Sequence, residues 1–210
     1  VSVMTASVTA DFLSSNVFGF QPVFQFQVAD ALPLRYYWLL LLLGILLGVL
    51  GAFYNWFTLK VQALYQKPEK LGNCTRILIP FLVAGILGYT APQVLGSGHH
   101  MVTLLTDGSL VLPTILLLLL GKFLFSAVSF GSGAPGGIFF PLLVLGCYIG
   151  GAFGQAAVQF AGVDEMFINN FIILAMAGYF TAIVRAPITG IILIFEMTGS
   201  FHQMLSLSVV

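Results

Sequence analysis

The stretch GSGAPGGIFFP, residues 131–141, places a glycine-rich turn directly before the expected start of a helix. The first amides of a helix have no acceptor within it, and in lipid each of them needs a partner. Here they belong to Ile138, Phe139 and Phe140, because the proline that follows has no N–H and fits a first helical turn. Together with the positive end of the helix dipole, these donors predict an anion-binding site that uses no charged side chain.

The glycines of this stretch suggest how an ion reaches the backbone. Gly131, Gly133, Gly136 and Gly137 have no side-chain bulk, so the chain can adopt positive φ there and approach a ligand closely. We count Gly137 with the three amides as a candidate anion-binding residue. An ion held only by amides is bound weakly enough to leave, as transport requires. The same residues also fit a tight turn packed between two helices, and the spacing alone favours neither interpretation.

The composition indicates an integral membrane protein. Hydrophobic residues make up 59% of the 210 residues and charged residues only 7%, whereas about 25% of a soluble domain is charged. The mean hydropathy is +1.05. Seven basic residues balance seven acidic ones, which argues against a nucleic-acid partner. Cys74 and Cys147 lie in unlike surroundings and predict free thiols, with neither a disulfide nor a metal site.

The apolar runs of the chain have two lengths. Because a helix needs about 20 apolar residues to cross a bilayer, four runs predict full spans: residues 38–57, 110–130, 138–160 and 166–184. Two shorter runs, 77–91 and 186–197, predict helices that are partial, tilted or re-entrant. Broken helices are typical of transporters and channels, whose helix ends point at a site within the membrane. We therefore expect an all-α membrane protein of about six to eight full or partial helices.

Linkers are predicted on either side of the first short run. Residues 58–76 hold four of the seven basic residues and predict a polar linker on the cytoplasmic side. Residues 92–107 predict a second linker, which contains GSGHH. Within the first span, Gly44 and Gly48 have the small-xxx-small spacing that brings membrane helices together, although glycine is also frequent in such helices without that role.

Two motifs resemble the CLC family of chloride channels and chloride/proton exchangers. GIFFP at 137–141 is similar to the family's G-x-F-x-P anion-binding motif, and VRAPITGIILIFEMTGSF at 184–201 is similar to a segment near the C-terminal end of its membrane domain. The resemblance implies that the amides of Ile138 and Phe139 coordinate a central anion and that the amide of Phe140 faces an outer one. It also implies the family's fold, a set of broken and re-entrant helices in two halves of inverted topology.

Only the second half of that fold is resembled. Residues 1–210 are therefore expected to be a partial CLC-type membrane domain, truncated at both ends, with residues 201–210 as the first turns of a further helix. The resemblance implies chloride transport by a voltage-gated channel or a chloride/proton antiporter, to which this chain supplies part of the pathway. It further implies no enzymatic activity, no cofactor besides the transported ion, and a homodimer in the plasma membrane. The surface at residues 1–15 and 186–210 is expected to face the second subunit.

Three charged side chains in apolar surroundings need a role. Lys122 interrupts a leucine-rich run, where it could attract anions, and we expect it to snorkel or to pair with a carboxylate. Arg185 is expected to hydrogen-bond the carbonyls that end the preceding helix. For Glu196 we expect a position at a helix end or interface in preference to a proton relay.

Two other functions fit parts of the sequence. A non-conducting membrane scaffold, or one half of an assembly, would use the apolar surface without the pathway. Ser97, His99 and His100 could instead supply the nucleophile and base of an intramembrane serine protease. Neighbouring residues seldom face each other on a helix, and G-S-G is common in turns, so we expect a loop there. Labelling of Ser97 by a fluorophosphonate would favour the protease.

Overall fold

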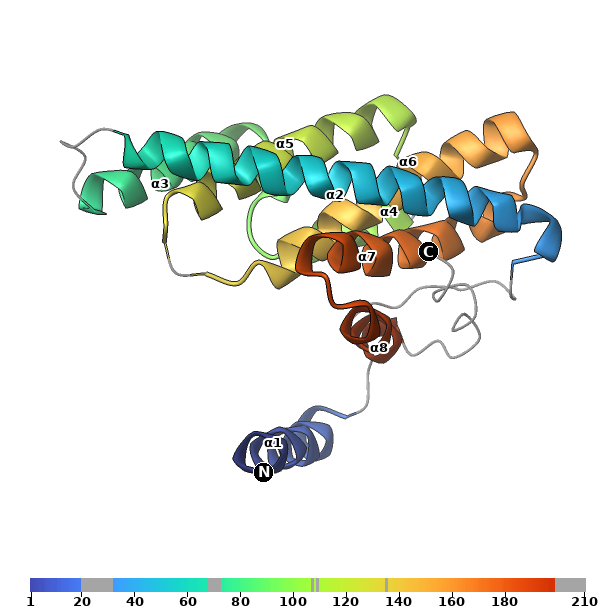
Figure 1. The fold of residues 1–210 in the computed structure, drawn as a ribbon, viewed down its shortest axis with the longest axis horizontal. Helices are drawn as coiled ribbons and strands as arrows, with labels where there is room; N and C mark the ends of the chain where they lie inside the picture. The colour runs from blue at the N-terminus through green and yellow to red at the C-terminus, as the bar shows by residue number, and fades with distance from the viewer. Residues whose placement is uncertain (20–31, 68–72, 107, 109, 135, 199–210) are drawn as a thin grey trace.

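The computed structural model describes residues 1–19, 32–67, 73–106, 108, 110–134 and 136–198, and the described residues form helices, turns and loops without a strand. The chain order is shown in Figure 1. Eight α-helices lie in the described residues: α1 Ser2–Phe18, α2 Tyr37–Gln66, α3 Asn73–Thr90, α4 His99–Thr106, α5 Leu112–Gly131, α6 Phe139–Ala161, α7 Ile168–Val184 and α8 Pro187–Thr198. Three short 3₁₀ helices accompany them: η1 Leu34–Tyr36, η2 Pro92–Val94 and η3 Glu165–Phe167.

Helices α6 and α7 form the centre of the bundle, and no other helix pair is in more extensive contact among the described residues. Glycines on α6 let the two backbones approach closely. A methyl group added at Gly146 would lie 2.7 Å from the carbonyl oxygen of Ala175, and one added at Gly150 would lie 2.6 Å from that of Phe171. Close approach through small residues is a main source of stability between helices in lipid, where no hydrophobic effect drives them together.

Helix α2 crosses the length of the bundle and packs against α5 and α7 (Figure 1). It presents a stripe of buried leucines, Leu40, Leu43 and Leu47, at the three- and four-residue spacing of one helix face. Further along α2, the hydroxyl of Tyr54 lies 2.8 Å from that of Ser126 on α5. Helix α2 is therefore tied to α5, the helix that leads into the glycine-rich turn.

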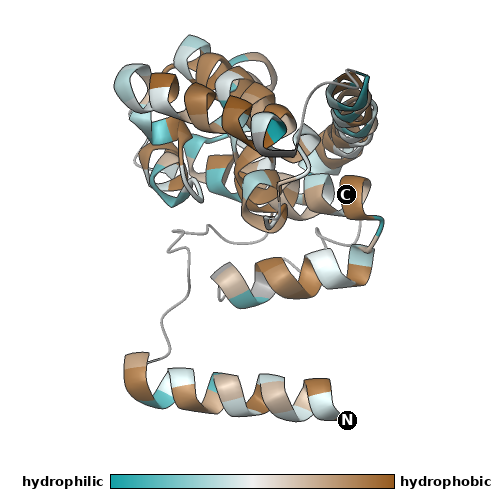
Figure 2. Cartoon of the chain, turned by 90° about the vertical axis from the view of Figure 1, so that its left-hand side faces the viewer, coloured by the Kyte–Doolittle hydropathy of each residue, from teal (hydrophilic) through white to brown (hydrophobic). Residues whose placement is uncertain are grey.

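The ends of the described chain lie at the edge of the bundle. Helix α1 is set apart from the other helices in both views and has no buried residue (Figures 1 and 2). Helix α8 packs on α7, and a methyl group added at its Gly190 would lie 2.5 Å from the hydroxyl oxygen of Thr181. Brown, hydrophobic ribbon dominates the bundle in Figure 2, as expected for helices whose outer faces contact lipid.

The predicted spans are confirmed. Four helical segments are long and apolar enough to cross a membrane: Leu34–Gln66, Leu112–Gly131, Phe139–Ala161 and Glu165–Val184. Both shorter runs are helices as well, α3 and α8. The all-α class and the expected number of helices are therefore correct for the described residues.

Two predictions about local structure are wrong. Residues 58–66 continue α2 and residues 73–76 begin α3, so these parts of the predicted linker are helical. The polar side chains of residues 58–66 lie on a helix that extends past its apolar part. Residues 99–106 form α4, with buried Met101, Val102 and Leu105 on one face. For Gly48 the sequence left a close helix contact and an ordinary membrane-helix glycine both open. A methyl group there would meet nothing within 4 Å among the described residues, which favours the ordinary glycine. The expected helix at 201–210 lies outside the described residues.

Candidate anion-binding site

The helix after the glycine-rich turn begins where the sequence predicts. Helix α6 starts at Phe139, and Ile138 is its N-cap residue with φ −87° and ψ −16°. The first amide to find an acceptor is that of Leu142, which donates to the carbonyl of Ile138 at 3.2 Å. In the described part of the chain, the amides of Ile138, Phe139 and Phe140 donate to no protein oxygen. Three hydrogen-bond donors are thus available at the positive end of a 23-residue helix.

The turn itself is held by Ser132. Its hydroxyl donates to the carbonyl of Ser129 at 2.7 Å and accepts from the amide of Ala134 at 3.3 Å. Gly133 has φ 76°, a conformation that favours glycine. Of the four glycines at which the sequence permits positive φ, only Gly133 adopts it.

The other three glycines of the turn have different surroundings. A methyl group at Gly131 would lie 2.5 Å from a methyl group of Val61 on α2, so close packing explains this glycine. At Gly136 and Gly137 an added methyl group would meet nothing within 4 Å. The backbone immediately before the three unpaired amides therefore borders open space.

Two aromatic rings flank the helix start. The Phe139 ring lies edge-to-face against Phe140, with ring centroids 5.4 Å apart, and against Phe180 of α7 at the same distance. Phe139 is half-buried, whereas Phe140 is 36% exposed. The contact with Phe180 fixes the first turn of α6 against α7, so the amide donors are mounted on the most tightly packed part of the bundle.

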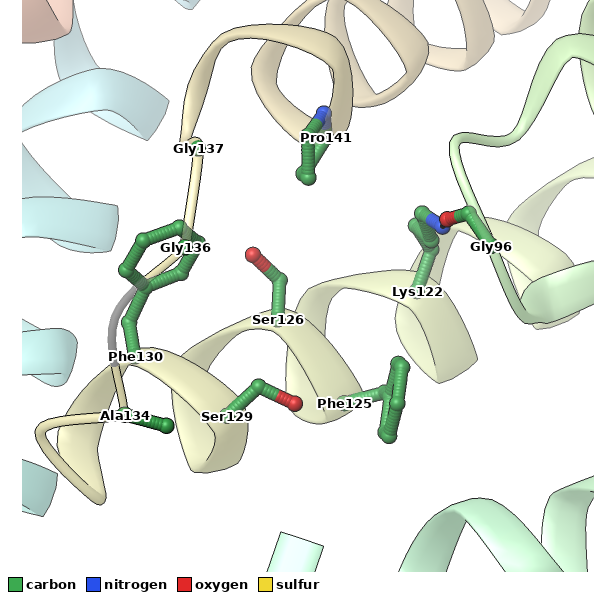
Figure 3. Close-up of a pocket in the computed structure, with 10 residues that line it drawn as sticks. All are labelled: Gly96, Lys122, Phe125, Ser126, Ser129, Phe130, Ala134, Gly136, Gly137 and Pro141. Atoms are coloured by element: carbon green, nitrogen blue, oxygen red, sulfur yellow. Dashed lines mark hydrogen bonds between the residues drawn. The ribbon is translucent and has the colours of Figure 1, made fainter. Parts of the chain in front are cut away.

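A pocket of about 190 Å³ lies beside the turn, and Figure 3 shows the residues that line it. Helix α5 contributes Lys122, Ser126 and Ser129, while the turn and α6 contribute Gly137 and Pro141. The pocket places polar side chains of α5 opposite the backbone that precedes the unpaired amides.

Lys122 is only 2% exposed. Its ammonium group donates to the carbonyl of Val94 at 2.8 Å and to that of Gly96 at 3.0 Å, which ties α5 to the end of η2. The expectation that Lys122 snorkels to a membrane surface or pairs with a carboxylate is wrong in the described structure, because its amine is buried and its partners are backbone oxygens. Its predicted attraction for anions stays a prediction.

Arg185 ends α7 through its backbone. It has φ 61° and ψ 36°, and its own amide donates to the carbonyl of Thr181 at 2.8 Å. Arg185 thus makes the expected hydrogen bond to a carbonyl at the end of the preceding helix, but through its backbone amide. Its side chain is exposed and makes no hydrogen bond among the described residues. The side chain of Glu196 is exposed on α8, and its expected interface role stays a prediction.

The serine–histidine cluster lies on the surface of the described structure. Ser97 lies in a turn, His99 and His100 begin α4, and all three side chains are exposed. An intramembrane protease needs its nucleophile and base together in a shielded pocket, which this segment does not form. Cys147 is a buried free thiol, as predicted, while the side chain of Cys74 lies outside the described part of the chain. Within the described residues, no cluster of side chains suited to a metal ion is present.

Taken together, the geometry defines an all-α integral membrane protein with four helices long and apolar enough to cross a membrane. Unpaired backbone donors lie where a packed helix starts, beside a pocket whose mainly apolar lining includes Lys122 and two serines. The sequence matches the model of one protein family, described as voltage gated chloride channel, over residues 1–210. The chain belongs to this family. The resemblance seen in its two motifs is therefore correct.

Individual relatives agree with this assignment. The H(+)/Cl(-) exchange transporter ClcA of Klebsiella pneumoniae subsp. pneumoniae is 35% identical over 177 residues, which are 82% of this chain and 37% of that protein. The crystal structure of a slow cyanobacterial Cl-/H+ antiporter is similar with a TM-score of 0.87 and 27% identity, over 96% of this chain and 48% of the other. The structure of a CLC-type fluoride/proton antiporter, 21% identical, has the same fold with a TM-score of 0.73, over 98% of this chain and 48% of the other.

These relatives are longer than the chain described here, which spans about half of their length or less. They are transporters, which agrees with the expectation that this protein is not an enzyme.

Proposed function

We propose that this chain forms part of a transmembrane chloride pathway, in which the backbone amides of Ile138, Phe139 and Phe140 bind the ion in passage. The observation that carries the proposal is the absence of a protein acceptor for these three amides within the described structure. Gly137 borders the same open space and lets an ion reach them. In a membrane, three unpaired donors on one helix end are costly unless a ligand accepts from them.

The physical properties of such a site suit transport. Amide donors and the helix dipole attract a small anion without a full charge, so that the ion can be stripped of water and still leave. The rings of Phe139 and Phe140 shape the space around the helix start. Because the rings offer only apolar surface, the amides are the groups that replace the ion's hydration shell.

Exchange of chloride against protons is supported more strongly than a simple channel. The curated relative is named as an exchange transporter, and the solved structure at 27% identity is described as an antiporter. A channel remains the alternative. An exchanger would use a proton gradient to drive chloride into vesicles against the chloride gradient, whereas a channel would not.

Several further features of the protein belong to this proposal. Residues 1–210 would form one half of an inverted-repeat membrane domain, and the complete protein would act as a homodimer in the plasma membrane. Chloride is the only ligand the proposal requires, and no cofactor takes part. A non-conducting scaffold is the alternative that an absence of flux would support.

The test is to remove a single amide hydrogen. Replacing Phe139 by its α-hydroxy acid analogue converts the amide into an ester, which deletes the N–H and keeps the ring. We expect chloride affinity to fall about 10- to 100-fold, the range that corresponds to one hydrogen bond to a charged group. Titration calorimetry of the purified protein and chloride flux from proteoliposomes measure the effect.

Two further variants at the same position complete this test, one that keeps the N–H and one that removes it. Phe139→Leu keeps the N–H, so its chloride affinity should stay close to that of the parent protein. Phe139→Pro also deletes the N–H, and proline suits a first helical position, although the ψ of −16° at Ile138 is unfavourable before proline. Chloride binding that survives the ester substitution unchanged would exclude the Phe139 amide as a ligand.

A further inference from the structure

The pocket beside the turn contains a buried cation without a counter-charge. Lys122 is 2% exposed, and no carboxylate among the described residues lies within salt-bridge distance of it. A buried charge that is not paired strongly destabilises a protein, because the charge loses its hydration. The two carbonyls of Val94 and Gly96 supply hydrogen bonds but only partial negative charge.

The hydrogen bonds of Lys122 leave one donor unused. An ammonium group carries three N–H donors, and two of them are taken by the carbonyls of Val94 and Gly96. Lys122 itself lines the pocket beside the glycine-rich turn. The remaining N–H is therefore available to a ligand in that space.

Two serines on the same helix extend the set of donors. Residues 122, 126 and 129 recur at spacings of four and three, so their side chains share one face of α5. The Ser126 hydroxyl points toward the space beside Pro141 in Figure 3. It is 2.8 Å from the Tyr54 hydroxyl, and either atom can donate. When Tyr54 donates, the hydrogen of Ser126 is free to point into the pocket. The hydroxyl of Ser129 donates to no protein acceptor in the described part of the chain.

We propose that this pocket is a second anion-binding site, in which the ammonium of Lys122 and the hydroxyls of Ser126 and Ser129 bind one small monovalent anion. A volume of about 190 Å³ accommodates a halide together with water molecules. The bound anion neutralises the buried ammonium. The site therefore uses a side-chain charge, in contrast to the amides at the start of α6.

Gly137 connects the two sites, because it lines the pocket and directly precedes the unpaired amides. An ion in the pocket would therefore lie beside Gly137, the residue directly before the amide of Ile138. As a stage on a chloride pathway the pocket rests on the proposed function, whereas as a binding site it stands on Lys122 and the two serines.

The test uses bromide as a probe that replaces chloride and is located by anomalous diffraction. Crystals of the purified protein grown in bromide should show one peak within hydrogen-bonding distance of Lys122 and another at the amides of residues 138–140. Lys122→Met should abolish the first peak and keep the second. The Phe139 ester should do the reverse, which separates a failure of this inference from a failure of the proposed function.

Control variants separate charge from folding. Lys60→Met removes an exposed lysine that stacks on Trp56 of α2, and both peaks should persist. Lys122→Arg keeps the charge and should keep the pocket peak. If Lys122→Met does not fold, Ser126→Ala and Ser129→Ala test the same site, with an expected loss of bromide affinity of about 10-fold or more each, the value of one hydrogen bond to a charged group.

Two results would overturn this inference alone. One is a bromide peak in the pocket that persists at full height in Lys122→Met. The other is parent protein with a peak at residues 138–140 and none near Lys122, which would leave the proposed function intact. A structure of the parent protein with neither peak would overturn both proposals.

Discussion

Glycines inside α6 and glycines in the turn before it serve opposite purposes. A methyl group added at Gly146 or Gly150 would lie less than 3 Å from the backbone of α7, whereas one added at Gly136 or Gly137 would meet nothing within 4 Å. In the helix, glycine brings two backbones together and sets the distance between α6 and α7. In the turn, glycine leaves space in front of the amides that begin the same helix. Closely packed glycines inside α6 and open glycines directly before it thus lie within twenty residues of each other.

The difference shows why a glycine-rich sequence cannot be interpreted from its composition alone. Glycine allows close packing at Gly150, adopts positive φ at Gly133 and leaves open space at Gly137. Each reason predicts a different response to the same small substitution, glycine to alanine. A series of such variants therefore tests the comparison directly.

The largest effect is expected for Gly150→Ala. Its added methyl group would lie 2.6 Å from the carbonyl oxygen of Phe171 and 2.7 Å from the Cα of Ile172, and backbone cannot move aside as a flexible side chain can. We expect a loss of about 1–3 kcal/mol of stability, the range for overpacked cores. Thermal unfolding of the purified protein in detergent measures it.

Gly48→Ala is the matched control, because Gly48 also lies inside a membrane helix but has no neighbour within 4 Å of the added methyl group. Alanine should be neutral there or stabilise by up to about 1 kcal/mol, since it is the better helix former. Equal losses of stability in the two variants would contradict the proposed difference between the two glycines.

A smaller loss is expected for Gly133→Ala. With φ at 76°, alanine at this position would adopt a conformation that costs about 1–2 kcal/mol for an L-residue. Gly136→Ala, three residues later and without positive φ, should change stability by less than about 0.5 kcal/mol. The prediction fails if the two substitutions shift the unfolding temperature by the same amount.

A gain in stability is expected for Arg185→Gly. Helices α6 and α7 end in the same left-handed conformation, with φ 63° at Gly162 and φ 61° at Arg185. Glycine avoids the steric cost of this conformation but loses more backbone entropy, so the net gain should be about 0.5–1 kcal/mol. The opposite substitution at the end of α6, Gly162→Ala, should lower the stability by a similar amount. Destabilisation by Arg185→Gly would instead indicate that the guanidinium has a partner in the complete protein.

The sequence predicted those parts of the structure that depend on local signals. The four long spans and the start of α6 follow from hydropathy and from the positions of glycine and proline, and the structure agrees within one or two residues at most ends. The residues between the first two spans were misjudged, because polar side chains on residues 58–66 conceal a helix that continues beyond its apolar part. Helix α4 was missed because the glycines at its start resemble loop sequence.

Contacts between residues far apart in the chain could not be predicted from the sequence. The partners of Lys122 are carbonyls 26 and 28 residues away, and a carbonyl leaves no trace in the amino-acid pattern. The small-xxx-small spacing drew attention to Gly44 and Gly48, while Gly146 and Gly150 on α6, with the same spacing, form the contact. Which of two equivalent patterns is used depends on the face that each helix turns toward its neighbour, and this is decided by the whole bundle.

The smallest effect on folding, and the most informative, is expected for Gly137→Ala. The added methyl group meets nothing within 4 Å and the position has no positive φ, so stability should change by less than about 0.5 kcal/mol. The methyl group would, however, occupy space beside the amide of Ile138, where the proposed ion must approach. Chloride affinity measured by calorimetry should therefore fall while the unfolding temperature stays constant. A variant with both unchanged would indicate that the ion approaches from the other side of the helix start, and a variant with lower stability would indicate that Gly137 packs against a part of the protein beyond the described residues.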